Sequence, residues 1–300
     1  MSKDKLGIIL AILAAICYSL LNPINKLVNN EISPLLSASM LYFGTLVVGL
    51  IILLVQLIAK KITKDNLLNK KDFINLLVAS LFHISSCVLL MFGLTYLSSS
   101  NASLLASFEI ISTSLIAFFL FKERINNFLW IGIVFIFLAC VTISLGDFEN
   151  LNFSIGTLLC LLSPLSMGFA NNFLKKVSYK NPAISVSFLG LLGGSVTLII
   201  ALIIGERFTS ISASMIELSL GMFSYGIALI LFIFAEKYIG AAKTSAFFSL
   251  APFIAIILSL IIFKETPNYT FYIGLGLLFI GVIFASLDAF YKKRSIDSKR

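Results

Sequence analysis

The chain has 300 residues, of which 59% are hydrophobic and only 12% charged, and its mean hydropathy is +1.04. Soluble domains average about 45–50% apolar and about 25% charged residues. A water-soluble globule is therefore excluded, because so few polar residues cannot cover so much apolar surface. The formal net charge of +8 does not indicate nucleic-acid binding, since the basic residues are spread over short connecting segments.

Ten apolar segments follow one another along the chain, separated by short polar connections. Each is close to the roughly 20 residues that a helix needs to cross a bilayer. Strands of a membrane β-barrel would be about 10 residues of alternating polarity, which these segments are not. The segments cover residues 6–28, 35–59, 73–95, 100–121, 127–146, 154–177, 183–205, 213–235, 241–263 and 269–290. The sequence thus predicts an all-α polytopic membrane protein with ten transmembrane helices.

The first segment is basic and then apolar, as a signal peptide would be. We interpret it as the first membrane helix, because the apolar run is long and has no A-x-A-type cleavage site followed by a soluble chain.

Basic residues predict the orientation of the ten helices, since Lys and Arg gather in cytoplasmic loops. An even number of spans puts both termini on one side, and 19 of the 22 Lys and Arg residues fall on that side. Only Lys26, Arg207 and Lys264 fall on the other. We therefore expect both termini in the cytoplasm and the protein in the cytoplasmic (inner) membrane.

The chain repeats itself. At an offset of 142, Lys122-Glu123 aligns with Lys264-Glu265 and Gly132 with Gly274. This predicts two five-helix units, residues 1–150 and residues 151–300. Because five is odd, the second unit enters the membrane upside down relative to the first. Inverted repeats are typical of secondary transporters, in which two halves alternate access to a central site.

Two stretches carry a resemblance to a known family. NASLLASFEIISTSLIAFFLFKE (101–123) and GAAKTSAFFSLAPFIAIILSLIIFKE (240–265), one in each half, resemble the paired signatures of the drug/metabolite transporter superfamily, EamA-like branch. The pattern from Gly156 to Lys175 is also similar to that branch. The resemblance implies ten helices, an inner-membrane location and transport of small metabolites such as amino acids. Members often carry an Arg early in the second helix of a half, where Met40 and Phe188 stand here.

Glu109 is the leading candidate site residue, because it lies mid-span, where a charged side chain costs roughly 3 kcal/mol to insert. At helical spacing, a face of small and polar residues surrounds it, and a bulky face lies opposite. The first face holds Ala102, Ala106, Ser112 and Thr113, and the second holds Leu104, Phe108, Ile111, Leu115 and Phe118. We expect the bulky face to meet lipid. Glu109 is then a proton-coupling or substrate-amine site, or a protonated group bonded to a neighbouring helix.

His83, the only histidine, lies mid-span on the third segment. Consecutive helices with short connections often pack together, so a His83–Glu109 pair is one hypothesis. A structural core histidine is the other.

Pro252 falls mid-span in the second half, at the position that aligns one residue after Glu109. Proline removes a backbone hydrogen bond, so we expect a bend there and another at Pro164. One half would then place an ionisable group at the centre and the other a bend. A packing kink without substrate contact is the alternative.

Further candidates line the same expected pathway. Asn22 and Asn171 are related by the repeat, and either they and Asn172 bind a polar substrate or they join helices. Tyr18 shares a helical face with Asn22, as a cavity wall or a core aromatic. Lys243 is an orientation charge or a contact for an anionic substrate.

The sequence therefore predicts a secondary transporter of small polar metabolites, amino acids or related compounds, with proton coupling as a hypothesis. No cofactor or metal site is expected, and no nucleotide-binding G-x-x-x-x-G-K-[ST] motif occurs. The alternatives are a non-transporting sensor or scaffold, a passive facilitator and a drug exporter of the same fold. The expected partners are the substrate and the lipid bilayer. A monomer already holds both halves, and a homodimer is the other arrangement considered.

Overall fold

The computed structural model describes residues 3–60, 67–122, 125–145, 151–239, 244 and 247–297, and for 145, 151–154, 236, 237 and 288–297 only the backbone. The elements of these residues are helices. They are α1 (Lys3–Ser19), α2 (Leu21–Val28), α3 (Pro34–Ile58), α4 (Lys70–Tyr96), α5 (Ser99–Ala106), α6 (Phe108–Phe121), α7 (Asn127–Leu145), α8 (Leu151–Lys175), α9 (Pro182–Ile204), α10 (Ile211–Leu220), the π-helical segment η2 (Gly221–Ile227), α11 (Ala228–Ile239), α13 (Ala251–Phe263) and α14 (Tyr269–Asp297).

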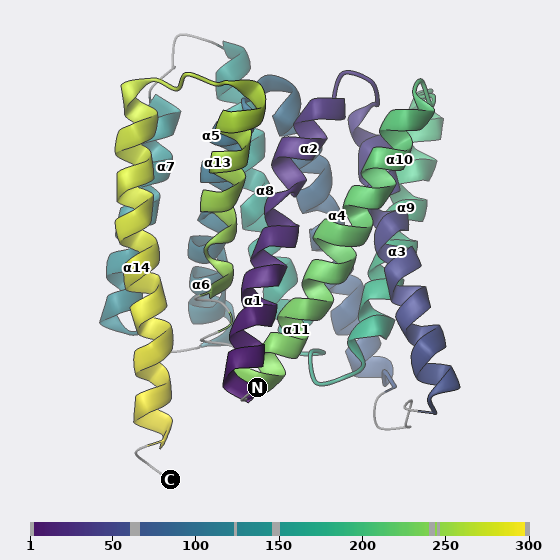
Figure 1. Ribbon diagram of the computed structural model, residues 1–300, viewed down its shortest axis with the longest axis horizontal. Coiled ribbons are helices and arrows are strands. Elements are labelled where there is room, and N and C mark those ends of the chain that lie inside the picture. The colour runs from purple at the N-terminus through teal and green to yellow at the C-terminus, as the bar shows by residue number, and fades with distance from the viewer. Residues whose placement is uncertain are drawn as a thin grey trace.

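The predicted all-α fold with about ten spans is confirmed. Nine helical spans of the described residues are long and apolar enough to cross a membrane, and the shorter apolar helix α13 forms part of a further one. Several predicted limits agree closely, as for the segment expected at 35–59, which is Pro34–Ile58, whereas the last helix runs beyond its expected end at 290 to Asp297. Both termini lie at the same end of the bundle (Figure 1).

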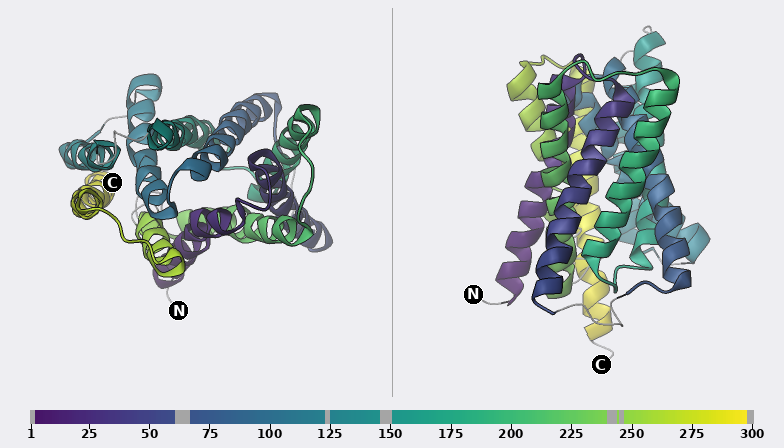
Figure 2. Two further views of the ribbon diagram at one scale, coloured as in Figure 1. Left: turned by 90° about the horizontal axis from the view of Figure 1, so that it is seen from above. Right: turned by 90° about the vertical axis from the view of Figure 1, so that its right-hand side faces the viewer.

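Helices of the first half pack against helices of the second. The most extensive pairs are α3 with α9, α4 with α8, α7 with α14, and α1 with α11. The α7–α14 pair stands side by side at one edge of the bundle (Figure 2). Each pair combines one helix of the first half with one of the second, so the most extensive packing is between the halves.

Glycine makes this close packing possible. A Cβ at Gly190 on α9 would overlap the backbone of Leu46 on α3, and one at Gly193 would meet the Tyr42 ring. Lipid gives apolar helices no hydrophobic reason to associate, so small residues that let backbones approach closely supply the contact. The glycines of α9 therefore align α3 and hold Tyr42 in place.

Polar contacts tie the same two helices together at both ends. Ser33, the N-cap residue of α3, donates its hydroxyl hydrogen to Glu206, just beyond the end of α9, at 2.5 Å. At the other end, Asn181, the N-cap residue of α9, donates to Gln56 near the end of α3, also at 2.5 Å. The two contacts occupy equivalent positions in the inverted repeat, since each starts from the N-cap residue of one of the two helices. They place α3 and α9 antiparallel and in fixed register.

Four spans are irregular near their middle. The first is divided at Leu20 between α1 and α2, and the fourth at Ser107 between α5 and α6. The eighth contains η2 between α10 and α11. In the ninth, α13 begins at Ala251 with Pro252 in its first turn. Discontinuous helices are characteristic of transporters, and π-helical segments occur frequently at functional sites.

The structure corrects one expectation about these spans. A break is present in both halves, because Ser107 interrupts the fourth span two residues before Glu109 even though no proline stands there. Pro164 lies inside α8, and the bend expected there stays a prediction.

The expected lipid-facing stripe of the fourth span is also wrong. Leu104 is 0% exposed and Ile111 is 2% exposed, and both belong to the main apolar core. The break at Ser107 shifts the helical phase of α6 relative to α5, and α8 and α13 cover the span on other sides. A single helical wheel drawn through residues 102–118 therefore assigns the wrong faces.

Replacing Gly190 with Ala should lower the free energy of unfolding by about 1–3 kcal/mol, because the new methyl group overlaps the backbone of Leu46. Thermal melting of the detergent-solubilised protein measures the effect. The matched control is Gly276→Ala, since a Cβ there meets no atom within 4 Å. Equal melting temperatures for the two variants would contradict the proposed role of glycine in the α3–α9 contact.

Candidate functional site

Glu109 lies where the fourth span restarts, in the first turn of α6. Its Oε1 accepts a hydrogen bond of 2.7 Å from Asn171 Nδ2 on α8, and the same amide nitrogen lies 3.4 Å from Thr113 Oγ1. The side chain is deep in the bundle but keeps part of its surface accessible. A carboxyl group of the first half thus meets an amide of the second half at mid-span.

A cluster of aromatic rings surrounds His83. The Tyr42 hydroxyl lies 2.8 Å from His83 Nδ1 and donates to the His83 carbonyl oxygen at 2.9 Å. When the hydroxyl hydrogen points to the carbonyl, Nδ1 must carry the ring proton and donate it to the hydroxyl oxygen. Tyr225 of η2 stands edge-on to the His83 ring, with centroids 5.1 Å apart. Three helices therefore fix the position of the histidine.

Tyr18 extends this cluster. Its ring stacks on Tyr225 at 6.4 Å between centroids and tilts against Phe248 at 5.3 Å. It also lies within electrostatic range of Glu109. Like His83, Tyr18 is only partly buried. The two predicted residues and Tyr225 thus form one wall, which we call the aromatic wall.

The hypothesis of a His83–Glu109 pair is wrong for this conformation. Each group has a different partner among the described residues. His83 is bonded to Tyr42 of α3, and Glu109 is bonded to Asn171 of α8. The glycine-mediated approach of α9 to α3 positions the Tyr42 ring beside His83, an effect that the order of helices along the chain does not reveal.

The predicted asparagines hold the broken fourth span from opposite ends. Asn22 donates to Ser103 Oγ on α5 at 3.1 Å, while its repeat partner Asn171 binds Glu109 on α6. Asn172 donates to two backbone oxygens, those of Thr113 at 3.0 Å and Gly168 at 2.8 Å. Asn172 therefore joins helices, whereas Asn171 presents its amide to an ionisable group.

Two further residues were predicted for the site, Pro252 and Lys243. Pro252 lies in the first turn of α13 and is partly buried. Lys243 lies outside the described residues.

Sequence reasoning missed three residues. Tyr42 and Tyr225 gave no signal, because aromatic residues are abundant throughout the apolar spans. Glu217 on α10 is 0% exposed, and it could have been found by the criterion that identified Glu109. It is a lone carboxyl group in the apolar run ISASMIELSLGMF.

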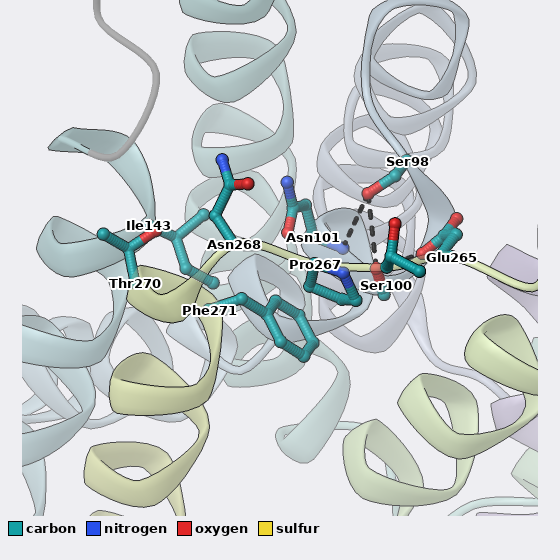
Figure 3. Close-up of a pocket in the computed structure, with 10 residues that line it drawn as sticks. Ser98, Ser100, Asn101, Ile143, Glu265, Pro267, Asn268, Thr270 and Phe271 are labelled. Atoms are coloured by element: carbon teal, nitrogen blue, oxygen red, sulfur yellow. Dashed lines mark hydrogen bonds between the residues drawn. The ribbon is translucent and has the colours of Figure 1, made fainter.

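A polar pocket of about 270 Å³ opens at the end of the bundle opposite the termini. Figure 3 shows its lining, where Ser98 accepts a hydrogen bond from the Asn101 backbone at 3.3 Å and Ser100 donates to Glu265. The first unit supplies Ser98, Ser100, Asn101 and Ile143, and the second supplies Glu265, Thr266, Pro267, Asn268, Thr270 and Phe271. Both halves therefore contribute to this pocket.

Residues 5–145 and 154–287 each match the model of the EamA-like transporter family. The chain belongs to this family. It is accordingly a multi-pass membrane protein of a transporter family, and the resemblance read from the two signature stretches is confirmed.

The relatives carry transporter names without a stated substrate. An uncharacterized transporter of Methanothermobacter thermautotrophicus is 30% identical over 206 residues, which span 66% of this chain and 60% of the relative. The uncharacterized transporter YyaM of Bacillus subtilis is 26% identical over 252 residues, covering 79% of this chain and 80% of the relative. A crystal structure with 16% sequence identity covers 94% of this chain and 96% of its own, with a TM-score of 0.69, and shares the fold.

Removing the Tyr42 hydroxyl should destabilise the protein by about 1–3 kcal/mol, because the His83 ring nitrogen loses its hydrogen-bond partner inside the bundle. Thermal melting of Tyr42→Phe tests this. Tyr269→Phe is the control, since Tyr269 is 77% exposed. A Tyr42→Phe variant as stable as the control would show that the contact contributes little.

Proposed function

We propose that this protein is a secondary transporter of small polar metabolites, with amino acids and related amines as the substrate class. The units 1–150 and 151–300 would rock against each other to alternate access to the centre, with both termini in the cytoplasm. Proton exchange at Glu109 would drive the substrate through the cytoplasmic membrane.

The observation that carries this proposal is the contact of Glu109 with Asn171. The contact crosses between the halves and lies beside the break at Ser107. A rocking motion that separates α6 from α8 would remove the amide and admit water to the carboxyl group. Such a change in environment alters proton affinity, which is what coupling requires.

Substrate recognition is assigned to the aromatic wall, Tyr18, His83 and Tyr225. Aromatic faces attract ammonium groups electrostatically, and the phenol and imidazole edges provide hydrogen-bonding groups. Glu109 lies within electrostatic range of this wall. A protonated amine held by Glu109 would therefore rest its carbon skeleton against Tyr18, and proton and amine would compete for one carboxyl group.

The irregular spans supply the moving parts. Ser107 in the fourth span and Leu250 in the ninth fall near equivalent positions of the repeat. Backbone groups freed at mid-membrane are tolerated only where protein or a water-lined cavity satisfies them. Paired breaks at the centre thus favour a substrate pathway between the two halves.

Glu109→Gln should abolish accumulation driven by a pH gradient while the protein still folds, because an amide cannot release a proton. A melting-temperature screen of amino acids and amines first identifies a ligand, whose uptake into proteoliposomes is then measured with and without the gradient. Glu31→Gln is the control, as Glu31 is exposed at the far end of the bundle. Full gradient-driven uptake by Glu109→Gln would refute proton coupling, and gradient-independent uptake by the wild type would indicate a facilitator. Ligand binding without any flux would indicate a sensor.

Single cysteines at the two chain ends should react with a membrane-impermeant maleimide only after the inner face becomes accessible. The experiment uses a background in which the four native cysteines are replaced. Thr209→Cys, exposed at the opposite end of the bundle, should react in intact cells. Labelling of either terminus in intact cells would contradict the predicted orientation.

A further inference from the structure

Glu217 is a fully buried carboxyl group that the proposed mechanism does not use. It lies on the inward face of α10 with Ala213, Ser214 and Leu220, while Met215 and Ile216 beside it are exposed. Its own exposure is 0%. Glutamate is almost never fully buried unless it is paired, so the contacts of this side chain determine its state.

Among the described residues, neither carboxyl oxygen of Glu217 lies within hydrogen-bond distance of a partner. Ser37 on α3 is close enough to interact with this carboxyl group, and its hydroxyl also donates to Asn25 Oδ1 at 3.1 Å, with Met91 Sδ at 3.4 Å. An unpaired carboxylate in such a place loses its hydration without compensation, whereas the neutral acid loses far less. The geometry therefore favours a carboxyl group that carries a proton.

No nearby cation replaces that proton. Among the described residues, Lys26 is the basic residue of α2, and it donates to the Leu94 carbonyl oxygen on α4 at 2.6 Å. On α3, the titratable Tyr42 is bonded to His83. Other titratable groups of this region are the Tyr225 phenol of η2, the Cys87 thiol of α4 and the exposed carboxylate of Glu31, which accepts from Ser210 Oγ at 3.0 Å. The connection before α10 adds Glu206 and the exposed Arg207. Among the described residues, none of these groups donates to the Glu217 carboxyl oxygens.

Glu217 lies where the two halves touch through an irregular helix. It precedes η2 by one turn, and η2 packs on α3 of the first unit. A Cβ at Gly221 would overlap the Leu41 carbonyl, and one at Gly44 would overlap that of Leu218. Because the backbones touch directly here, separating η2 from α3 would take Glu217 from a dry environment to a wet one.

We propose that Glu217 is a proton-binding site, occupied while α10 and η2 are packed against α2 and α3 and emptied to water when this contact opens. Proton release leaves a carboxylate that water can solvate, so a high pH favours the open arrangement. The site itself is independent of transport. Its use in a transport cycle rests on the proposed alternating access and would add a second titrating carboxyl group to Glu109.

Infrared spectroscopy of the full chain in lipid nanodiscs tests the site, because a protonated carboxylic acid has a C=O stretch that a carboxylate lacks. At about pH 7.5, well above the ordinary glutamate value of about 4.3, the Glu109→Gln variant should retain an acid band. The double variant Glu109→Gln/Glu217→Gln should lose it. Glu265→Gln is the control and should leave the band unchanged.

Absence of an acid band in Glu109→Gln at this pH would overturn the proposal even if no Glu217 variant folds. A band that persists in the double variant would overturn it as well. Loss of the band on replacing KCl with NaCl would assign the site to Na⁺ instead of a proton. None of these results depends on flux, so they remain separate from the uptake test of Glu109.

The opening is tested by melting temperature as a function of pH. The packed state binds a proton that the unfolded chain releases at neutral pH, so wild-type stability should fall as pH rises from about 6 to about 9. Glu217→Gln should melt at a temperature less dependent on pH. Glu217→Met, which cannot titrate, should match it. Identical pH profiles for the wild type and both variants would contradict coupling of this proton to packing.

Discussion

Close contact between helices of opposite halves is the constraint on which the rest of this structure depends. Lipid offers apolar helices no gain for leaving it, so association must come from close packing and from polar contacts. Gly190 and Gly193 provide the first along α3 and α9, and the N-cap residues Ser33 and Asn181 provide the second at the two ends. Because this pair is fixed, the Tyr42 ring of α3 is held beside His83 of α4.

The proposed function uses the places where this regular packing is interrupted. Breaks at Ser107 and before Ala251 fall at equivalent points of the two units, although only the second contains a proline. In the broken span of the first unit, Asn22 binds Ser103 of α5, while Asn171 from the second unit binds Glu109 of α6. Because α5 and α6 are held by different partners, they can move relative to each other, and Glu109 lies next to their junction.

Glu109 and Glu217 differ in their surroundings, and this difference suggests different roles. Glu109 has an amide partner from the other half and partial access, which suits exchange with a substrate or water. Glu217 has no exposed surface and no hydrogen-bond partner within the described part of the chain, which suits a proton retained until the helices separate. Both sit at contacts between units, so motion between the halves would change both environments.

The sequence by itself determined the all-helical membrane fold with about ten spans, its two repeated halves and the family. These properties depend on local hydrophobicity and on charge placement, because each span must satisfy its own backbone in lipid. The sequence also singled out Glu109 and Asn171 as candidates, but only the tertiary structure decided that they are partners. It likewise decided that His83 binds Tyr42, that Leu104 and Ile111 are buried, and that Glu217 is fully buried. Those facts depend on which helices touch, and glycine-mediated approach between segments about 150 residues apart leaves no periodic signal in any one segment.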